Sequence, residues 1–445
     1  MFRKKIVSAT ASASNVATGK IAGVAYKAAD IANKVVSKIP GVDHITIPDD
    51  LSEVTHIGAE VSADLPGLQD NSVQKIWASV ESFYRSQLHN QITLCVRREG
   101  KIILNRSIGI AKGQYGDETA IAGSVDTPFC LFSASKAVSA LLLCKFDELE
   151  ELSLSDTISR YIPEFGKHGK KNITLGELIS HRAKVPSVQF EAPAQLTDHD
   201  FVLDHLCDSR PNDAKQAYHA ITGGFIIAEV IERITDKPIG EALDTYFRKP
   251  LSMKYFTYGL ERKYRDLSSE SHVSGIPLIG PLKQVPVDVL GMSADEVVNF
   301  SNTNAFMDAV LPSGNMFATA DECSRFYQML LDDGVYNGHQ VLHPDTIREA
   351  RGGGFLPRWD DTFNLPAHFS RGGFMLNTPP LMLFGLNAPR AFGHLGFINI
   401  LSWADLQRGI SVGLLTSGKP FLGPHLYNFA NIPSTINRYC PKLSR

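Results

Sequence analysis

A Ser-x-x-Lys motif, Ser133 to Lys136, stands where an apolar run changes into a helix-forming run. The run 127–132 predicts a short buried segment, and the apolar residues 137–144 predict a buried helix. Ser133 is then expected at the helix N-terminus, where free backbone N–H groups stabilise negative charge. Lys136 shares its helix face and is within reach of the serine hydroxyl. Because burial lowers the pKa of a lysine, Lys136 is a candidate base for activating Ser133 as a nucleophile.

A second tetrapeptide with the same pattern, Ser72 to Lys75, shows that the motif alone is weak evidence. Its surroundings form one apolar helical stripe, and Lys75 lies off that stripe. We therefore predict a structural helix over 72–88, with its N-cap among residues 70–72, and assign the chemistry to Ser133.

The composition is that of an ordinary globular protein: 445 residues, 43% hydrophobic and 20% charged, with a net charge of −3. This length allows two or three domains, or one large fold with an inserted lobe. The charge balance gives no reason to expect nucleic acid as a partner, and no apolar stretch has the length of a membrane-spanning helix. Free buried thiols are predicted for the six scattered cysteines, Cys95, Cys130, Cys144, Cys207, Cys323 and Cys440.

The first 40 residues are unusually basic, with seven Lys or Arg and one acid, a formal charge of +6. Apolar residues recur at helical spacing, while Lys20, Lys27 and Lys34 recur on another face. One interpretation is an amphipathic segment over 1–48 that makes weak peripheral contact with an anionic membrane or a partner. The other is a helix packed on its own domain, or a poorly ordered terminus. A signal peptide is not indicated, so the expected location is cytoplasmic or peripheral to a membrane.

Strand signals occur at both ends of the remaining chain. A hairpin is predicted from 91–97 and 102–110, and late strands from 398–404 and 410–416. The region between is mostly helical, with helices predicted at 175–180, 200–207 and 225–234, and the Gly- and Pro-rich stretch 352–382 is expected to be a long surface loop. These signals predict an α/β (α+β) fold with one antiparallel sheet, flanked by helices and closed by N- and C-terminal segments.

These signals divide the chain into the N-terminal segment and a catalytic domain over 70–430 that follows it. Its α/β part is expected at about 72–150 and 305–430. An inserted, mostly helical lobe is expected at about 150–300.

Two further segments complete a candidate site. Tyr218 precedes the predicted helix 225–234, where its hydroxyl could share a proton with Lys136 and pass it to a leaving group. The segment Phe392-Gly393-His394-Leu395-Gly396-Phe397 enters the late hairpin, and its glycines allow close approach of the backbone to a substrate. An N–H near Phe397 is then a candidate second oxyanion donor beside Ser133. His394 is either a wall of this site or a hydrogen-bonded strand histidine.

In their order along the chain, these motifs resemble those of the serine β-lactamase-like superfamily, with its class C β-lactamases, D-alanyl-D-alanine carboxypeptidases and β-lactamase-like carboxylesterases. Further stretches match in the same order: Leu154-Ser155-Asp156, Tyr161–Phe165, Ile173–His181, Pro312–Asn315 and Ser324-Arg325-Phe326. The resemblance covers residues 75 to 420. It implies a β-lactamase/transpeptidase-like fold, with Ser133, Lys136 and Tyr218 as catalytic residues and His394, Gly396 and Phe397 beside the substrate.

Three departures from the family pattern matter. The family's Tyr-x-Asn is Tyr218-His219-Ala220, and its Lys-Thr-Gly is His394-Leu395-Gly396. Both changes resemble the carboxylesterase branch, whose substrates lack the carboxylate that the lysine would meet. The family's Thr-Ser-Gly after the helix histidine is Arg182-Ala183-Lys184, which places two cations in a loop that is normally small and neutral. The residues alone give no physical reason for this third change, which would alter the site entrance.

A metal site can be considered for one acidic stretch, but it lacks recognised ligand spacing and is better interpreted as a solvated helix face. The residues concerned are His199, Asp200, Asp204, His205 and Cys207. No metal or cofactor is expected, since the chain has no phosphate-cradling loop and no dinucleotide fingerprint.

The leading hypothesis is a serine hydrolase that cleaves small-molecule carboxylic esters, with lactones or amides as further substrates, through an acyl-enzyme at Ser133. The first alternative is a β-lactamase or D,D-peptidase acting on β-lactams or peptidoglycan peptides, which Ala220 and His394 disfavour. The second alternative is a non-catalytic, membrane-associated binding or scaffold protein, which the intact Ser133, Lys136 and Tyr218 set disfavours.

Overall fold

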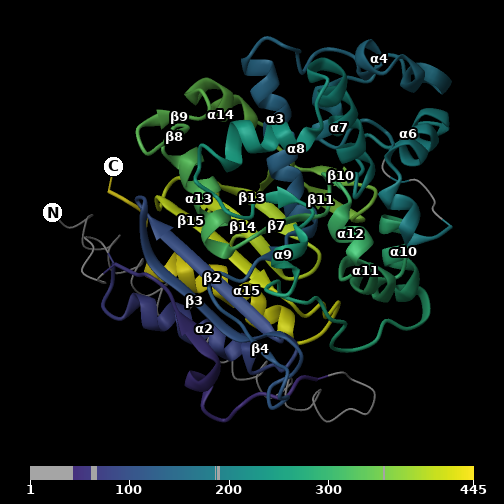
Figure 1. Ribbon diagram of the computed structural model, residues 1–445. Coiled ribbons are helices and arrows are strands. Elements are labelled where there is room, and N and C mark those ends of the chain that lie inside the picture. Colours follow the sequence, from purple (N-terminus) through teal and green to yellow (C-terminus); the bar gives the residue numbers. More distant parts are fainter. Residues whose placement is uncertain (1–43, 62–67, 186, 188–190, 354–355, 445) are drawn as a thin grey trace.

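The computed structural model describes residues 44–61, 68–185, 187, 191–353 and 356–444 (Figure 1). The basic segment 1–40, for which the sequence predicts an amphipathic helix, lies outside these residues. Among the helices that the structure describes, none is long and apolar enough to cross a membrane.

A mixed fold around one antiparallel sheet is confirmed. In the described part of the chain the sheet has eight strands, in the order β1-β3-β2-β15-β14-β13-β12, with β4 paired to β3. The strands are β1 (Thr55–Ile57), β2 (Gln91–Arg98), β3 (Lys101–Lys112), β4 (Ile121–Ala122), β12 (Met375–Leu376), β13 (Ala391–Gly396), β14 (Ile400–Asp405) and β15 (Ile410–Thr416). The early and late hairpins meet where β2 pairs with β15, so distant segments close one sheet.

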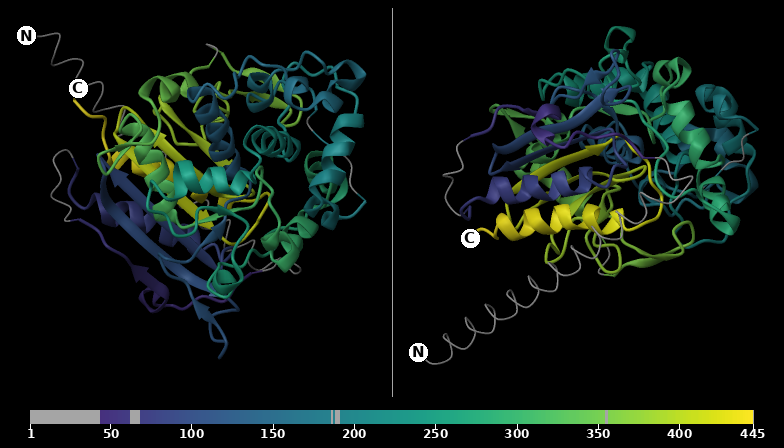
Figure 2. Two further views of the ribbon diagram at one scale, coloured as in Figure 1. Left: turned by 45° about the horizontal axis from the view of Figure 1, so that its top comes forward. Right: turned by 90° about the horizontal axis from the view of Figure 1, so that it is seen from below.

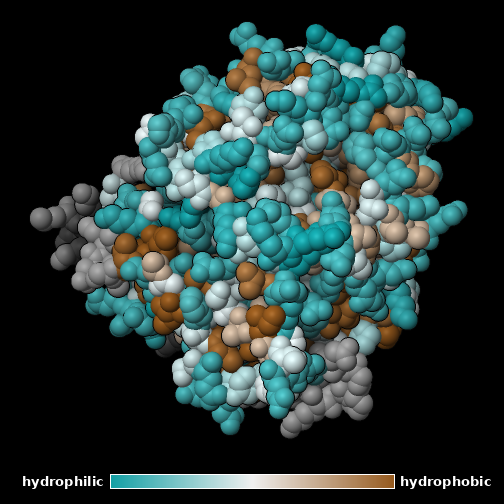
Figure 3. Space-filling view, viewed as in Figure 1, coloured by the Kyte–Doolittle hydropathy of each residue, from teal (hydrophilic) through white to brown (hydrophobic). Residues whose placement is uncertain are grey.

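Alternate residues of the central strands enter two different hydrophobic clusters, one on each face of the sheet. On β2, Leu94 and Val96 join the first cluster, and Cys95 between them joins the second. This alternation follows from the period of two in an extended chain. Because both faces of the sheet are apolar, other elements must pack against each of them. On the surface seen in Figure 3, by contrast, hydrophilic residues predominate and hydrophobic ones form small separate groups.

Helices cover both faces of the sheet. Helices α2 (Ser72–Tyr84) and α15 (His425–Tyr439) lie side by side on one face, as the right panel of Figure 2 shows. The rings of Phe83 and Phe429 join them, with centroids 5.8 Å apart. Helices α3 (Ser135–Glu148) and α13 (Ala320–Leu331) contact the strands from the other face.

The chain between α3 and α13 is mostly helical. Its helices are α4 (Ile158–Tyr161), α5 (Leu175–Ile179), α6 (His199–Asp208), α7 (Thr222–Thr235), α8 (Ile239–Leu243), α9 (Arg262–Arg265), α10 (Gln284–Leu290), α11 (Ala294–Ser301) and α12 (Asn304–Asp308), and α14 (Pro344–Arg351) follows α13. Three small sheets add β5 (Phe129–Cys130), β6 (Thr257–Tyr258) and β7 (Met316–Ala318), then β8 (Val335–Tyr336) with β9 (His339–Gln340), and β10 (Arg358–Asp360) with β11 (Leu365–Ala367).

The stretch 352–382, expected to be one long loop, instead contains the β10–β11 hairpin and β12. Strands of two or three residues are too short for alternation in the sequence to reveal them.

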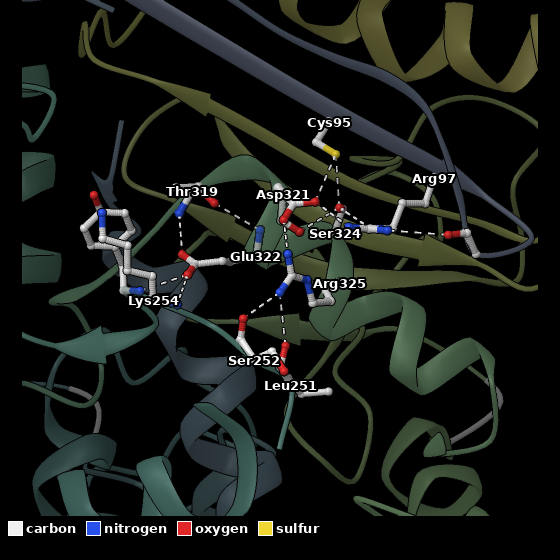
Figure 4. Close-up of polar contacts among 12 residues, drawn as sticks. Cys95, Arg97, Leu251, Ser252, Lys254, Thr319, Asp321, Glu322, Ser324 and Arg325 are labelled. Carbon is white, nitrogen blue, oxygen red and sulfur yellow. Dashed lines mark hydrogen bonds and ion pairs between the residues drawn. The ribbon is translucent and has the colours of Figure 1, made fainter. Parts of the chain in front are cut away.

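Helix α13 joins the sheet to the helical region (Figure 4). Glu322 closes a capping box with Thr319 at the start of the helix. Its carboxylate also accepts hydrogen bonds from the backbone N–H groups of Lys254, at 2.6 Å, and Tyr255, at 2.9 Å. The first turn of α13 is therefore joined to the segment at Lys254 and Tyr255, which lies 68 and 67 residues before Glu322.

Candidate active site

Ser133 lies in a tight 3₁₀ turn, Phe132–Ala134, that leads directly into α3. The α-helix thus begins at Ser135, two residues later than predicted. Phe132 has a φ of +47°, in the left-handed region, which costs a bulky residue about 1–2 kcal/mol. The Leu131 N–H donates to the Met316 carbonyl at 2.7 Å and anchors the turn to β7. The result is a partly exposed serine between two buried neighbours.

The Lys136 side chain is buried one helical turn away. Its Nζ donates a hydrogen bond to Ser133 Oγ at 3.0 Å and another to the Ser313 carbonyl oxygen at 2.8 Å. Burial lowers the pKa of Lys136 well below its usual value. A buried lysine that loses its proton more readily can act as a base toward a neighbouring hydroxyl group.

Tyr218 is buried beside this pair, with its ring centroid 5.2 Å from Lys136 Nζ. Burial raises the pKa of Tyr218, and a hydrogen bond with Ser133 opposes that shift. The structure therefore brings Ser133, Lys136 and Tyr218 together, although Tyr218 comes from the loop before α7.

Asp360, which the sequence did not single out, orders the tyrosine loop. Its carboxylate accepts a hydrogen bond from the backbone N–H of Tyr218 at 3.1 Å. The N–H groups of Thr362 and Phe363 donate to the same oxygen, each at 3.1 Å. An aspartate in a Gly- and Pro-rich stretch carries no signal that it reaches Tyr218, 142 residues away.

Three buried histidines border the same centre. The rings of His181 and His394 lie 4.7 and 6.1 Å from that of Tyr218, and His219 donates its backbone N–H to His181 Nδ1 at 3.0 Å. Burial, with a smaller effect from Lys136, lowers the pKa of His394 to about 3, and burial lowers that of His219 to about 3. These imidazoles are neutral near pH 7 and add no charge beside Lys136. The sequence motifs contain His181 and His219, but no pattern in the sequence indicated that either histidine lies at the site.

The two interpretations of His394 are not exclusive. Its Nδ1 lies 2.7 Å from the Leu395 carbonyl oxygen, as in a hydrogen-bonded strand histidine. Its buried Nε2 has no hydrogen-bond partner among the described residues, and its ring lies near Tyr218. The ring is thus held by the strand and also lies beside Tyr218.

Gly396 and Phe397 lie against the Ser133 turn. A Cβ on Gly396 would collide with the carbonyl oxygen of Leu131, so only glycine fits there. Phe397 follows the last residue of β13, and its ring centroid is 5.6 Å from that of Phe132. The end of β13 therefore runs beside the Ser133 turn.

An apolar pocket of about 70 Å³ opens at Ser133. Its lining includes Phe132, Ala220, Leu290, Met292, Phe300 and Phe397. Among the described residues that line it, only Ser133 and Ser313 carry polar side chains. Ala220 stands where the family pattern has an asparagine, and it contributes to this apolar surface.

The competing serine, Ser72, is buried at the start of α2. Its hydroxyl lies 3.2 Å from the Tyr439 carbonyl oxygen of α15, and Lys75 is exposed. This geometry fits the structural interpretation of that helix.

The residues considered for a metal site lie on α6, but His199 faces α7 instead of its own helix neighbours. Ligand atoms of His199, Glu229 and Glu232 lie within 4.8 Å of one another. His199 Nε2 is 3.0 Å from Glu229, and Arg233 also pairs with Glu229. Because Arg233 already pairs with Glu229, this group is explained by polar contacts between α6 and α7.

Comparison with known proteins shows the family of this chain. The beta-lactamase family model matches residues 80–435. The esterase/beta-lactamase LipL of Mycobacterium tuberculosis is 21% identical over 396 residues, which cover 84% of this chain and 86% of LipL. The N-acetylmuramyl-L-alanine amidase of Bacillus subtilis is 23% identical over 373 residues, 74% of this chain and 78% of the amidase.

Two solved structures have the same fold. A family VIII carboxylesterase superposes with a TM-score of 0.70 at 20% identity, covering 83% of this chain and 99% of the esterase. A penicillin-binding protein homolog from Caulobacter crescentus gives 0.68 at 22% identity, covering 82% of this chain and 98% of the homolog. With the family model matching most of its length, the chain belongs to the beta-lactamase family.

Proposed function

We propose that this protein is a serine hydrolase that cleaves carboxylic esters through an acyl-enzyme at Ser133. The observation that carries the proposal is the 3.0 Å contact between Lys136 Nζ and Ser133 Oγ inside a buried site. Neutral Lys136 accepts the serine proton while Oγ bonds to the ester carbonyl carbon. The bond from that carbon to the alkoxy oxygen then breaks, and the leaving group departs as an alcohol. Water repeats the sequence on the acyl-enzyme and releases the acid.

Tyr218 is proposed to work with Lys136 as a proton carrier. The two groups both contact Ser133, and burial opposes a charge on either of them. A proton shared between them can reach the leaving oxygen without a charged side chain remaining in the site.

The negative oxygen of the tetrahedral intermediate is proposed to lie between the Ser133 turn and the end of β13. Backbone N–H groups of Ser133 and Phe397 would donate to it, and Gly396 permits the close approach that this requires. His394 would shape the wall behind this position.

An uncharged, apolar substrate group is favoured by the pocket at Ser133. Ala220 and His394 replace an amide and a cation of the family pattern, so the site lacks groups suited to a β-lactam amide and carboxylate. The similarity to a family VIII carboxylesterase supports ester cleavage, whereas LipL is named as both an esterase and a beta-lactamase and fits either substrate.

The test compares Ser133→Ala with Ser72→Ala on p-nitrophenyl butyrate. We expect Ser133→Ala to abolish turnover and to block covalent labelling by a fluorophosphonate probe, since the nucleophile is gone. Ser72→Ala should retain most activity and should still label. Labelling that maps to any residue other than Ser133 would refute the proposal.

Comparing turnover of a β-lactam with turnover of the butyrate ester distinguishes a β-lactamase from an esterase. Turnover of a penicillin or cephalosporin is expected to be far slower than that of the butyrate ester. Comparable rates on both would favour the β-lactamase assignment.

A further inference from the structure

A second cavity, of about 280 Å³, lies beside the ring stack around Tyr218. Three arginines line it, Arg182, Arg358 and Arg371. Phe369 also lines it, and the Phe369 ring packs at 4.4 Å from His181 and 5.9 Å from Tyr218. The cavity shares no lining residue with the apolar pocket at Ser133, so the two are separate spaces.

The arginines come from three separate segments. Arg182 follows α5, is partly buried and donates from Nε to Ser180 Oγ at 2.9 Å. Arg358 begins β10, and Arg371 lies in the turn before β12; both are exposed. Within the described residues, neither the Arg358 nor the Arg371 side chain has a hydrogen bond or an ion pair. Most of their guanidinium donors are therefore available to a ligand.

Two of the nearby carboxylates, those of Glu177 and Asp360, are engaged elsewhere. Glu177 accepts the Thr174 N–H at 3.0 Å in the capping box of α5. Asp360 accepts backbone N–H groups from the Tyr218 loop and from the β10–β11 turn. Burial lowers the pKa of Arg182, and the positive charge of Arg358 lowers it further. The carboxylate of Glu177 opposes this shift, but its effect is smaller than that of Arg358. Three cations thus line one partly enclosed space, and none of them forms an ion pair with a described carboxylate. Asp213 and Asp361 line a neighbouring pocket together with Arg358.

We propose that this cavity binds a phosphate group, either free or carried by a small organic molecule. Guanidinium groups offer paired N–H donors at the spacing of phosphate oxygens, and charge-assisted bonds of this kind are strong. A phosphate carries about −1.5 to −2 near neutral pH, which matches three arginines better than the single charge of a carboxylate. Ser180, Ser370 and Gln216 add polar atoms to the wall.

A phosphate ligand would also explain why Arg182 stands in the loop where the family pattern has the small, neutral sequence Thr-Ser-Gly. The proposal does not depend on the reaction at Ser133.

The test is isothermal titration of the full chain with inorganic phosphate, and separately with glycerol phosphate, at constant ionic strength. The double variant Arg358→Gln/Arg371→Gln removes two exposed guanidinium groups, so the fold should be retained. We expect it to bind the better of the two ligands at least about tenfold more weakly than the unaltered chain. Lys184→Gln is the matched control, because it removes an exposed cation from the Arg182 loop that does not line the cavity. It should bind within about twofold of the unaltered chain.

Retention of the near-UV circular dichroism spectrum in both variants verifies that the comparison is between folded proteins. The proposal is overturned if neither phosphate compound binds the unaltered chain better than chloride at equal ionic strength. It is equally overturned if the double variant binds as well as Lys184→Gln. Preference for glycerol phosphate over inorganic phosphate would identify an organic phosphate as the ligand class.

Discussion

The carbonyl oxygen of Ser313 accepts a hydrogen bond from Lys136 Nζ at 2.8 Å, although the two residues are 177 positions apart. The hydroxyl of the same serine accepts the Gly224 N–H of α7 at 2.8 Å. A Cβ on Gly224 would collide with Ser313, so glycine is needed for this approach. Ser313 thus joins α3, which carries Lys136, to α7, which follows the Tyr218 loop.

Lys136 and Tyr218 should behave as one unit in mutational tests. Lys136→Ala and Tyr218→Phe are each expected to lower kcat/KM for p-nitrophenyl butyrate by roughly a thousandfold, and the double variant little further, because residues that share one proton act non-additively. The measurement is a double-mutant cycle on kcat/KM. Losses that simply multiply in the double variant would contradict the shared-proton mechanism.

The pH dependence of kcat/KM should reveal the neutral form of Lys136. Burial lowers its pKa, so the active, unprotonated amine exists at pH values well below the usual lysine range. Activity should fall as the pH decreases through this lowered pKa and should be retained above it. The measurement is a pH–rate profile with the butyrate ester.

His394→Asn is the control for this profile. The pKa of His394 is lowered to about 3, so its titration should not shape the profile near neutral pH. If the acidic limb disappears in His394→Asn, the limb belongs to the histidine and not to Lys136.

The apolar pocket should impose a preference for acyl chain length. Each methylene that enters it is worth about 0.8 kcal/mol, so kcat/KM should rise roughly fourfold per methylene from acetate until the pocket is full. Leu290→Trp adds volume to the pocket wall and should lower activity on the longer esters with little effect on acetate. Leu282→Trp, at an exposed position outside the lining, is the matched control. An unchanged chain-length profile in Leu290→Trp would mean that the acyl chain binds elsewhere.

The basic N-terminal segment is expected to be dispensable for catalysis. The truncation should begin at His44, because Ile45 is buried in the core and donates its N–H to the Gln87 carbonyl at 2.9 Å. The truncated protein should keep its esterase activity and lose co-sedimentation with vesicles that contain anionic lipid. Binding by the full chain should weaken with added salt. Loss of activity on truncation would instead show that the segment is part of the catalytic fold.

The sequence by itself determined the sheet hairpins, the helical middle of the chain and the Ser133–Lys136 pair. These features depend on local periodicity or on a three-residue spacing, both of which can be read directly from neighbouring positions. The order of the family-like motifs also predicted that Tyr218 and the His394–Phe397 segment would lie near Ser133.

Only the tertiary structure decided how these segments are held. Asp360 reaches the Tyr218 loop, and Ser313 reaches Lys136, through long-range hydrogen bonds that leave no periodic trace in the sequence. The three arginines of the second cavity likewise come from separate segments of the chain. Such contacts depend on how loops cross after the sheet and helices have packed, and local residue patterns do not encode those crossings.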